Sequence, residues 1–172
     1  MRGFLVLTGV LAAAAGLTGC GKDETATQRE KIGHVWKYET KDNQKIAYIG
    51  STNSVATQSA PDTFAVLLLN SLDNGTTGVT VKTVGAPFYC DLSDCTVTAS
   101  IDGGRAKIWQ GRMTDNQDGI FIPPARKASD MVMNGKVLTV TVGLTPKTSQ
   151  AFEFNVSGLE WNGKKPSAKP KV

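Results

Sequence analysis

Cys90 and Cys95 are the two side chains whose type and spacing come closest to defining a chemical site. Four residues separate them, whereas thiol oxidoreductases use a Cys-x-x-Cys spacing. A zinc site would need a second cysteine pair or a nearby histidine, and the sequence supplies neither. If the chain is exported, two cysteines such as Cys90 and Cys95 are expected to form a disulfide. Closing a loop of about six residues would stabilise the fold by about 2 kcal/mol.

The other reactive side chains indicate no particular reaction. His34 is the only histidine, and the chain has no Gly-x-Ser-x-Gly nucleophile motif. The motifs of zinc proteases, dinucleotide-binding proteins and P-loop proteins are also absent from the sequence. A glycosidase needs only two carboxylates, but the candidates lie in the cysteine loop or in turns, where aspartate bonds its own backbone. These candidates are Asp91, Asp94, Asp102, Asp115 and Asp118. We therefore expect no enzyme, metal or cofactor, with a glycan hydrolase as the alternative.

Aromatic side chains are the remaining candidates for a binding surface, although most of them should lie in the core. In a strand through Lys107–Gln110, Ile108 and Trp109 point to opposite faces. One of the two is therefore exposed unless both faces are covered. An exposed Trp109 would indicate a surface for a protein partner or a glycan.

Residues 1–19 have the layout of a secretory signal peptide. Arg2 precedes an apolar run from Phe4 to Gly16, and small residues follow at the expected cleavage position. The run is too short for a membrane span. We expect residues 1–19 to be removed.

The next feature is the quartet Leu17-Thr18-Gly19-Cys20, which closely resembles the lipobox of bacterial lipoproteins. The resemblance implies that Cys20 is lipidated and becomes the first residue of the mature chain. Two or three acyl chains then hold a protein stably at a membrane. In lipoproteins of Gram-negative bacteria an aspartate after the cysteine favours the inner membrane. Gly21 at that position implies the outer membrane, with the protein facing the periplasm.

The charge of the chain does not favour nucleic acid as a partner. Without Arg2 the mature chain has 18 basic and 15 acidic residues, a net charge of about +3. Four lysines lie in the Pro-containing tail, residues 163–172: Lys164, Lys165, Lys169 and Lys171. This tail is expected to be solvated and disordered. The alternative is that lysines such as Lys164 and Lys165 contact anionic lipid, lipopolysaccharide or an acidic partner.

Short runs of alternating apolar and polar residues, divided by Gly, Asn and Asp, predict antiparallel strands between residues 34 and 162. The run Thr63–Leu69 is apolar at every side chain after Thr63, which is typical of a central strand covered on each side. One short helix is predicted over Ala125–Asn134. The expected fold is all-β: an antiparallel β-sandwich or small barrel of about eight or nine strands. Residues 20–33 lack apolar periodicity and predict a flexible tether.

The expected domain also shows a similarity to a group of uncharacterised bacterial envelope proteins. An early Trp-x-Tyr (Trp36, Tyr38), the Cys90…Cys95 pair and the terminal run Phe152–Trp161 occur in a similar order in that group. The chain differs from the group by lacking an Arg-Phe before Asp102. This resemblance implies an envelope location and no activity.

Together these observations predict a lipid-anchored protein of the bacterial cell envelope that is not an enzyme. Its β-domain is expected to bind a protein or cell-wall partner, in an accessory, inhibitory or exclusion role. A purely mechanical role as a lipid-anchored spacer is a further alternative.

Overall fold

Nine strands and two helices form the part of the chain that this computed structural model describes, residues 21–124 and 127–161. The helices are α1 (Gly21–Ile32) and α2 (Ala128–Asn134). The strands are β1 (Lys37–Lys41), β2 (Gln44–Gly50), β3 (Phe64–Ser71), β4 (Thr77–Val84), β5 (Cys95–Ile101), β6 (Lys107–Met113), β7 (Gly119–Ile122), β8 (Val137–Thr145) and β9 (Thr148–Asn155).

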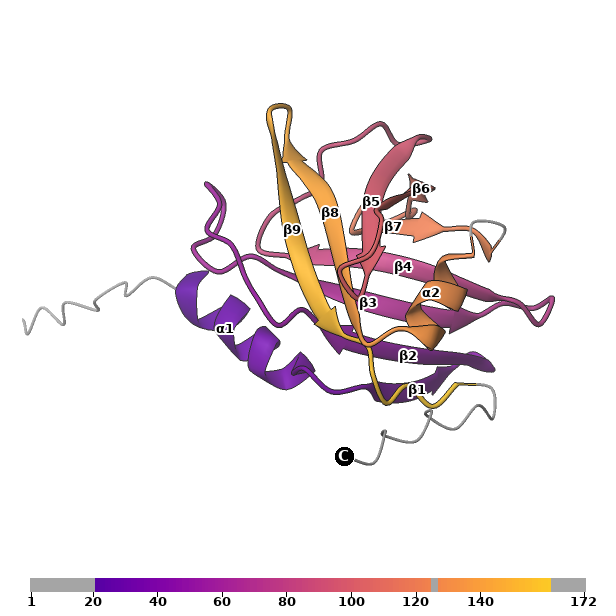
Figure 1. The fold of residues 1–172 in the computed structure, drawn as a ribbon. Helices are drawn as coiled ribbons and strands as arrows, with labels where there is room; N and C mark the ends of the chain where they lie inside the picture. Colours follow the sequence, from indigo (N-terminus) through magenta and orange to yellow (C-terminus); the bar gives the residue numbers. More distant parts are fainter. Residues whose placement is uncertain (1–20, 125–126, 162–172) are drawn as a thin grey trace, which may run out of the picture.

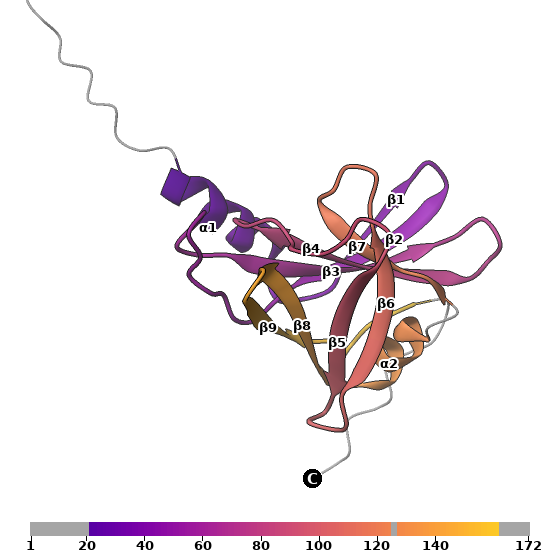
Figure 2. The ribbon, with the colours of Figure 1, turned by 90° about the horizontal axis from the view of Figure 1, so that it is seen from above.

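All nine strands belong to one antiparallel sheet in the order β1-β2-β3-β4-β7-β6-β5-β8-β9. Strand β6 belongs to both halves of this sheet. Residues 107–111 pair with β5, whereas only Arg112 and Met113 pair with β7. The half containing β1 to β4 and β7 therefore faces the half containing β5, β8 and β9 (Figures 1 and 2). This arrangement confirms the predicted all-β, sandwich-like fold.

The chain bends between the two halves at Gly111. A Cβ atom at this position would lie only 2.6 Å from the carbonyl oxygen of Phe121. A residue without a side chain therefore lets β6 approach β7 closely where it passes from the second half to the first.

The sheet remains open because β1 and β9 do not pair with each other. Instead, the segment after β2 bonds to β9. The backbone N–H of Thr52 donates to the carbonyl of Glu153 at 2.7 Å, and the Asn53 amide donates to the carbonyl of Ala151 at 2.9 Å. These contacts join the two halves on the side opposite the bend in β6.

The core lies between the two halves and follows the alternation in the sequence. In β8 every second residue from Leu138 to Leu144 is buried, and in β9 Phe152 and Phe154 are fully buried. Val156 is buried as well, so these three alternating positions of the final run face the core. The first half contributes Leu67 and Leu69 of β3 from the opposite side.

Helix α2 lies against the sheet and buries Ala128 and Val132 in the core. A helix was predicted over Ala125–Asn134, and the structure has it over Ala128–Asn134. The helix ends at Gly135, where an added Cβ atom would lie 2.1 Å from Ile101. Gly135 has φ −103°, so close packing explains the glycine there, rather than left-handed backbone.

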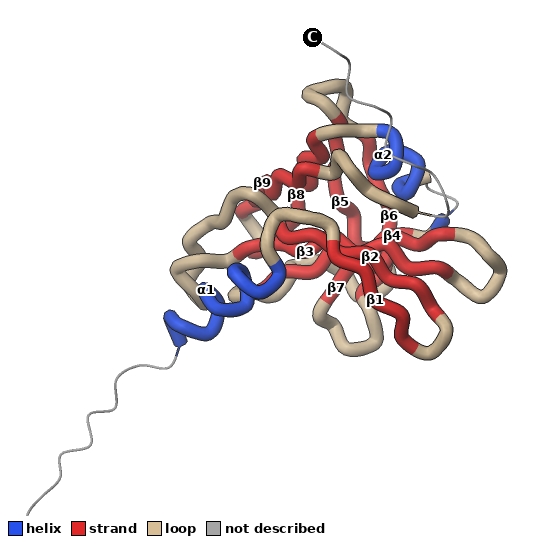
Figure 3. The backbone as a smooth tube through the Cα atoms, turned by 90° about the horizontal axis from the view of Figure 1, so that it is seen from below, coloured by secondary structure: helices blue, strands red, loops and turns tan. Residues whose placement is uncertain are grey.

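Helix α1 was not predicted, because residues 20–33 were expected to form a flexible tether. The structure instead has a twelve-residue helix over Gly21–Ile32, which lies beside β2 on the outside of the first half (Figure 3). Gly33 has φ +69° and its N–H donates to the carbonyl of Arg29 at 2.8 Å, which ends the helix. The prediction was wrong because polar contacts, rather than an apolar face, hold this helix.

Asp102 connects the turn between β5 and β6 to the start of β8. Its carboxylate oxygen Oδ1 accepts from the backbone N–H of Val137 at 2.8 Å and from that of Lys136 at 3.0 Å. These two bonds, the one from Val137 first, hold the pKa of Asp102 below its usual range. Asp102 thus bonds a distant strand, rather than its own turn as the sequence suggested.

The substitution Asp102→Asn is expected to remove a pH-dependent contribution to stability. Asparagine tolerates the φ of 51° found here and still offers an acceptor oxygen, but it carries no charge. Because the folded pKa of Asp102 is lowered, its contribution is present above about pH 4 and is lost as the pH falls through the folded value. Urea midpoints of the wild type and the variant should therefore differ at neutral pH and converge in acid. The variant Asp115→Asn, which makes the same charge change in an exposed loop, should show no such convergence; a constant gap for Asp102→Asn would contradict the assignment.

Candidate functional site

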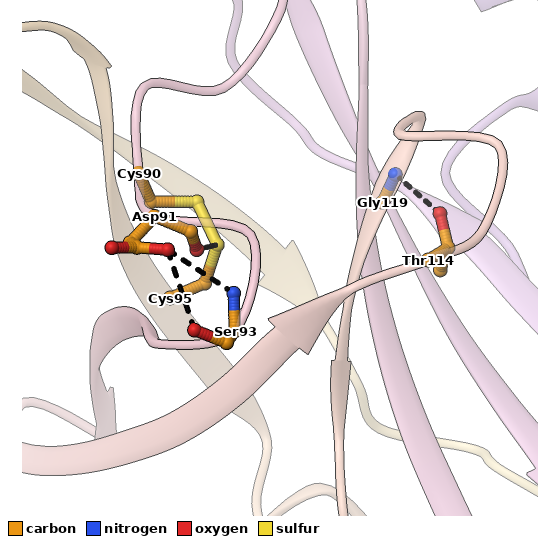
Figure 4. The surroundings of a disulfide bond; sticks show 6 residues. All are labelled: Cys90, Asp91, Ser93, Cys95, Thr114 and Gly119. Atoms are coloured by element: carbon orange, nitrogen blue, oxygen red, sulfur yellow. Dashed lines mark hydrogen bonds between the residues drawn. A yellow bond between two sulfur atoms is a disulfide. The ribbon is translucent and has the colours of Figure 1, made fainter.

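Cys90 and Cys95 form the predicted disulfide, with Cα atoms 5.1 Å apart (Figure 4). Inside the closed loop, the carboxylate of Asp91 accepts from the backbone and hydroxyl of Ser93 at 3.4 and 3.3 Å. The loop is joined to β6 by a bond from the N–H of Met113 to the carbonyl of Leu92 at 2.9 Å. Asp91 therefore has the turn role that its position predicted.

Trp109 is not exposed on the surface of the protein. Its side chain is 1% exposed and lies in the core between the two halves, whereas Ile108 is 69% exposed. The indole Nε1 of Trp109 has no hydrogen-bond partner among the described residues. The alternation in β6 was correct, but the large ring is on the inner face, where it fills space between the halves. The predicted binding surface at Trp109 is therefore wrong.

Several predicted sites fall outside the residues that the structure describes. These are the signal peptide over residues 1–19, the lipidation residue Cys20, and the tail lysines Lys164 and Lys165. His34 is described, and its side chain is exposed between α1 and β1.

The site that the structure adds is a groove of about 480 Å³ on the outer face of β2, β3 and β4, which we call the outer groove. Aliphatic side chains and one tyrosine form its floor: Ile46, Tyr48, Val66, Leu68 and Val84. The polar parts of its lining come from α1, β1, β4 and the loop before β7: Gln28, Lys31, Glu39, Lys82, Thr83 and Asp118. Its volume lies within the range of about 300–1,000 Å³ that is common for binding pockets.

Backbone pairing places the floor residues side by side. In the register of β2, β3 and β4, Tyr48 lies opposite Leu68, and Leu68 lies opposite Thr80. Alternation turns Ala47, Leu67 and Val81 into the core, so their neighbours must point outward. The outward residues of β2 and β3 therefore form one mainly apolar surface, which Thr80, Lys82 and Val84 of β4 continue.

Four of the polar groups at the outer groove form two pairs, Tyr48 with Glu39 and Lys82 with Asp118. The Tyr48 hydroxyl donates to Glu39 Oε1 at 2.8 Å, and this bond, with burial and the charge of Glu39, raises the pKa of Tyr48. At another side of the groove Lys82 Nζ lies 2.5 Å from Asp118 Oδ2. The bond from Lys82 lowers the pKa of Asp118, and a second bond comes from the Thr114 hydroxyl. These pairs leave the floor uncharged.

The centre of the groove is formed by a run that the sequence predicts to be a covered strand. The run Thr63–Leu69 predicted a strand covered on both faces. The structure confirms the inner cover and also buries Phe64 and Val66 on the outer face, whereas Leu68 on that face is only half-buried and lines the groove.

Within residues 21–124 and 127–161 no three His, Cys, Asp or Glu side chains are grouped so that they could hold a metal ion. In the same residues no helix has the length and apolar character needed to cross a membrane. Comparisons with protein-family models, curated proteins and solved structures found no match to this chain.

Proposed function

We propose that the protein is a lipid-anchored component of the bacterial cell envelope that binds another envelope protein and catalyses no reaction. The resemblance of Leu17-Thr18-Gly19-Cys20 to a lipobox supports the anchor and a location at the outer membrane, facing the periplasm. The outer groove supports the binding role, and it is the observation on which that role depends.

The chemistry of the groove favours an apolar protein segment over a glycan. A sugar offers hydroxyl groups at most positions, which need polar partners once they leave water. The floor offers mainly aliphatic surface, and the hydroxyl of Tyr48 already donates to Glu39. Burying one Leu, Val or Phe side chain of a partner stabilises a complex by about 1.5–3 kcal/mol. Two such side chains in the groove would supply useful affinity.

The anchor is tested on the protein purified from membranes of its own cells. Mass spectrometry should find diacylglycerol and acyl chains on an N-terminal Cys20, and Cys20→Ala should lack these chains and keep residues 1–19. An unmodified wild-type chain that still begins at Met1, or a Cys20→Ala variant processed like the wild type, would contradict the anchor.

The groove is tested by cross-linking in intact cells followed by mass spectrometry. We expect Leu68→Asn, which makes the centre of the floor polar at similar volume, to lower capture of a specific envelope protein at least tenfold. Ile108→Asn is the matched control, since it makes the same change at an exposed site on the other half. Equal capture by both variants would overturn the groove as the binding site. Recovery of cell-wall fragments alone, together with glycan cleavage by the purified protein, would instead support a hydrolase.

A further inference from the structure

Helix α1 is held to the domain by the side chain of Arg29. The guanidinium donates to the hydroxyl of Ser54, the carboxylate of Asp62 and the carbonyl of Thr52, each at 3.1 Å. All three acceptors belong to the segment between β2 and β3. The guanidinium thus uses its fixed set of donors on three points of one loop, which restrains both the position and the direction of the helix.

The carboxyl end of α1 is held by a second set of contacts. The N–H of Gly50 donates to the carbonyl of Gly33 at 3.0 Å, and a Cβ at Gly50 would lie 2.6 Å from that oxygen. The side chain of Ile32 packs against the same glycine. The ammonium group of Lys37 donates to the carbonyl of Lys31. With contacts at Arg29 and at its end, the helix cannot swing about residue 33 without breaking both sets.

The helix begins at Gly21, directly after Cys20. Twelve residues of α-helix span about 18 Å. Most of the described side chains on α1 are polar and exposed, and they include Glu24, Gln28 and Glu30. A helix without an apolar face has no means of lying in the headgroup region of a bilayer. The helix is therefore suited to point away from the membrane surface rather than to lie within the headgroup region.

We infer that α1 is a rigid spacer that fixes the orientation of the domain on the membrane. This inference rests on the proposed lipid anchor at Cys20. The loop between β2 and β3 then faces the membrane, and α2, which lies on the opposite side of the sheet from the start of α1 in Figures 1 to 3, faces away from it. The surface that α1 meets is the bilayer itself, and the amino end of the helix is the part that meets it.

The test uses the full lipidated protein in nanodiscs that contain a gadolinium-chelating lipid, with NMR line broadening as the measurement. Broadening depends steeply on distance, so it should be largest for the amide of Glu24, intermediate for Ser54 and absent for Met131 in α2. The enhancement at Ser54 should exceed that at Met131 several-fold. Similar broadening on all faces of the domain would overturn the inference.

Two variants separate a fixed helix from a flexible connection. Arg29→Gln should reduce the difference between Ser54 and Met131, while Arg105→Gln, which makes the same change at an exposed side chain between β5 and β6, should keep it. A Gly-Ser-Gly-Ser insertion between Cys20 and Gly21 should also reduce the difference. Retention of the full difference in both Arg29→Gln and the insertion variant would contradict the proposed role of α1. Mass spectrometry of the same sample shows whether Cys20 is lipidated, so failure of the anchor is distinguished from failure of the spacer.

Discussion

Replacing Trp109 by alanine is expected to lower the free energy of unfolding by about 3–5 kcal/mol, the usual cost of removing a buried aromatic side chain. The indole is one of the largest fully buried side chains and lies where the two halves of the sheet face each other. The surrounding strands are bonded to neighbours on both sides, so they can only partly collapse into the space left behind. Urea denaturation followed by circular dichroism measures the change.

The neighbouring residue is the control for this prediction. Ile108→Ala should change the free energy of unfolding by less than about 0.5 kcal/mol, because the side chain is 69% exposed. Trp109→Phe provides a milder variant that keeps most of the ring volume and removes the unpartnered Nε1 donor. It should be clearly more stable than Trp109→Ala. Equal effects of the alanine substitutions at positions 108 and 109 would contradict the orientation of β6.

Removing the disulfide is expected to lower the free energy of unfolding by about 2 kcal/mol, because the bond restricts a loop of about six residues in the unfolded chain. The double variant Cys90→Ala/Cys95→Ala is the appropriate change, since Cys95 is fully buried and an alanine introduces no buried hydroxyl. Urea midpoints are measured for the variant and for the wild type with and without a reductant.

The reduced wild type should have nearly the stability of the double variant. The reductant should leave the double variant unchanged, which controls for effects of the reductant itself. If the oxidised wild type and the double variant unfold at the same urea concentration, the loop contributes nothing to stability and the prediction is wrong.

Much of the strand arrangement could be predicted because it follows from local alternation. In the turn between β1 and β2, for example, Asp42 and Asn43 adopt φ of 50° and 63°. These values suit the two central residues of a tight hairpin turn, and Asp and Asn tolerate them well. Local chemistry was therefore sufficient to place this hairpin.

Helix α1 could not be predicted from local pattern because its stabilising contacts are distant in the sequence. Arg29 reaches residues 23 to 33 positions away, and Gly33 contacts Gly50. No apolar periodicity results from such contacts. The glycine at position 33 was a possible signal for the end of a helix.

For Trp109 and the outer groove, the alternation showed that two faces exist but not what covers each of them. Whether Trp109 or Ile108 is buried depends on the bend at Gly111, which turns one face of β6 toward the first half. Whether Leu68 is covered depends on the place where α1 lies. Both depend on the packing of distant segments, which periodicity does not contain.

The open sheet has a consequence for how copies of the protein coexist at high density. Unpaired strand edges of neighbouring molecules can join and aggregate, above all where molecules are concentrated on one surface. At Ala151 and Glu153 the β9 edge is occupied by bonds from Thr52 and Asn53. The β1 edge has Lys37 at one end and Lys41 at the other. Two such edges brought together would place like charges side by side, so electrostatic repulsion protects the molecule from strand exchange with its neighbours.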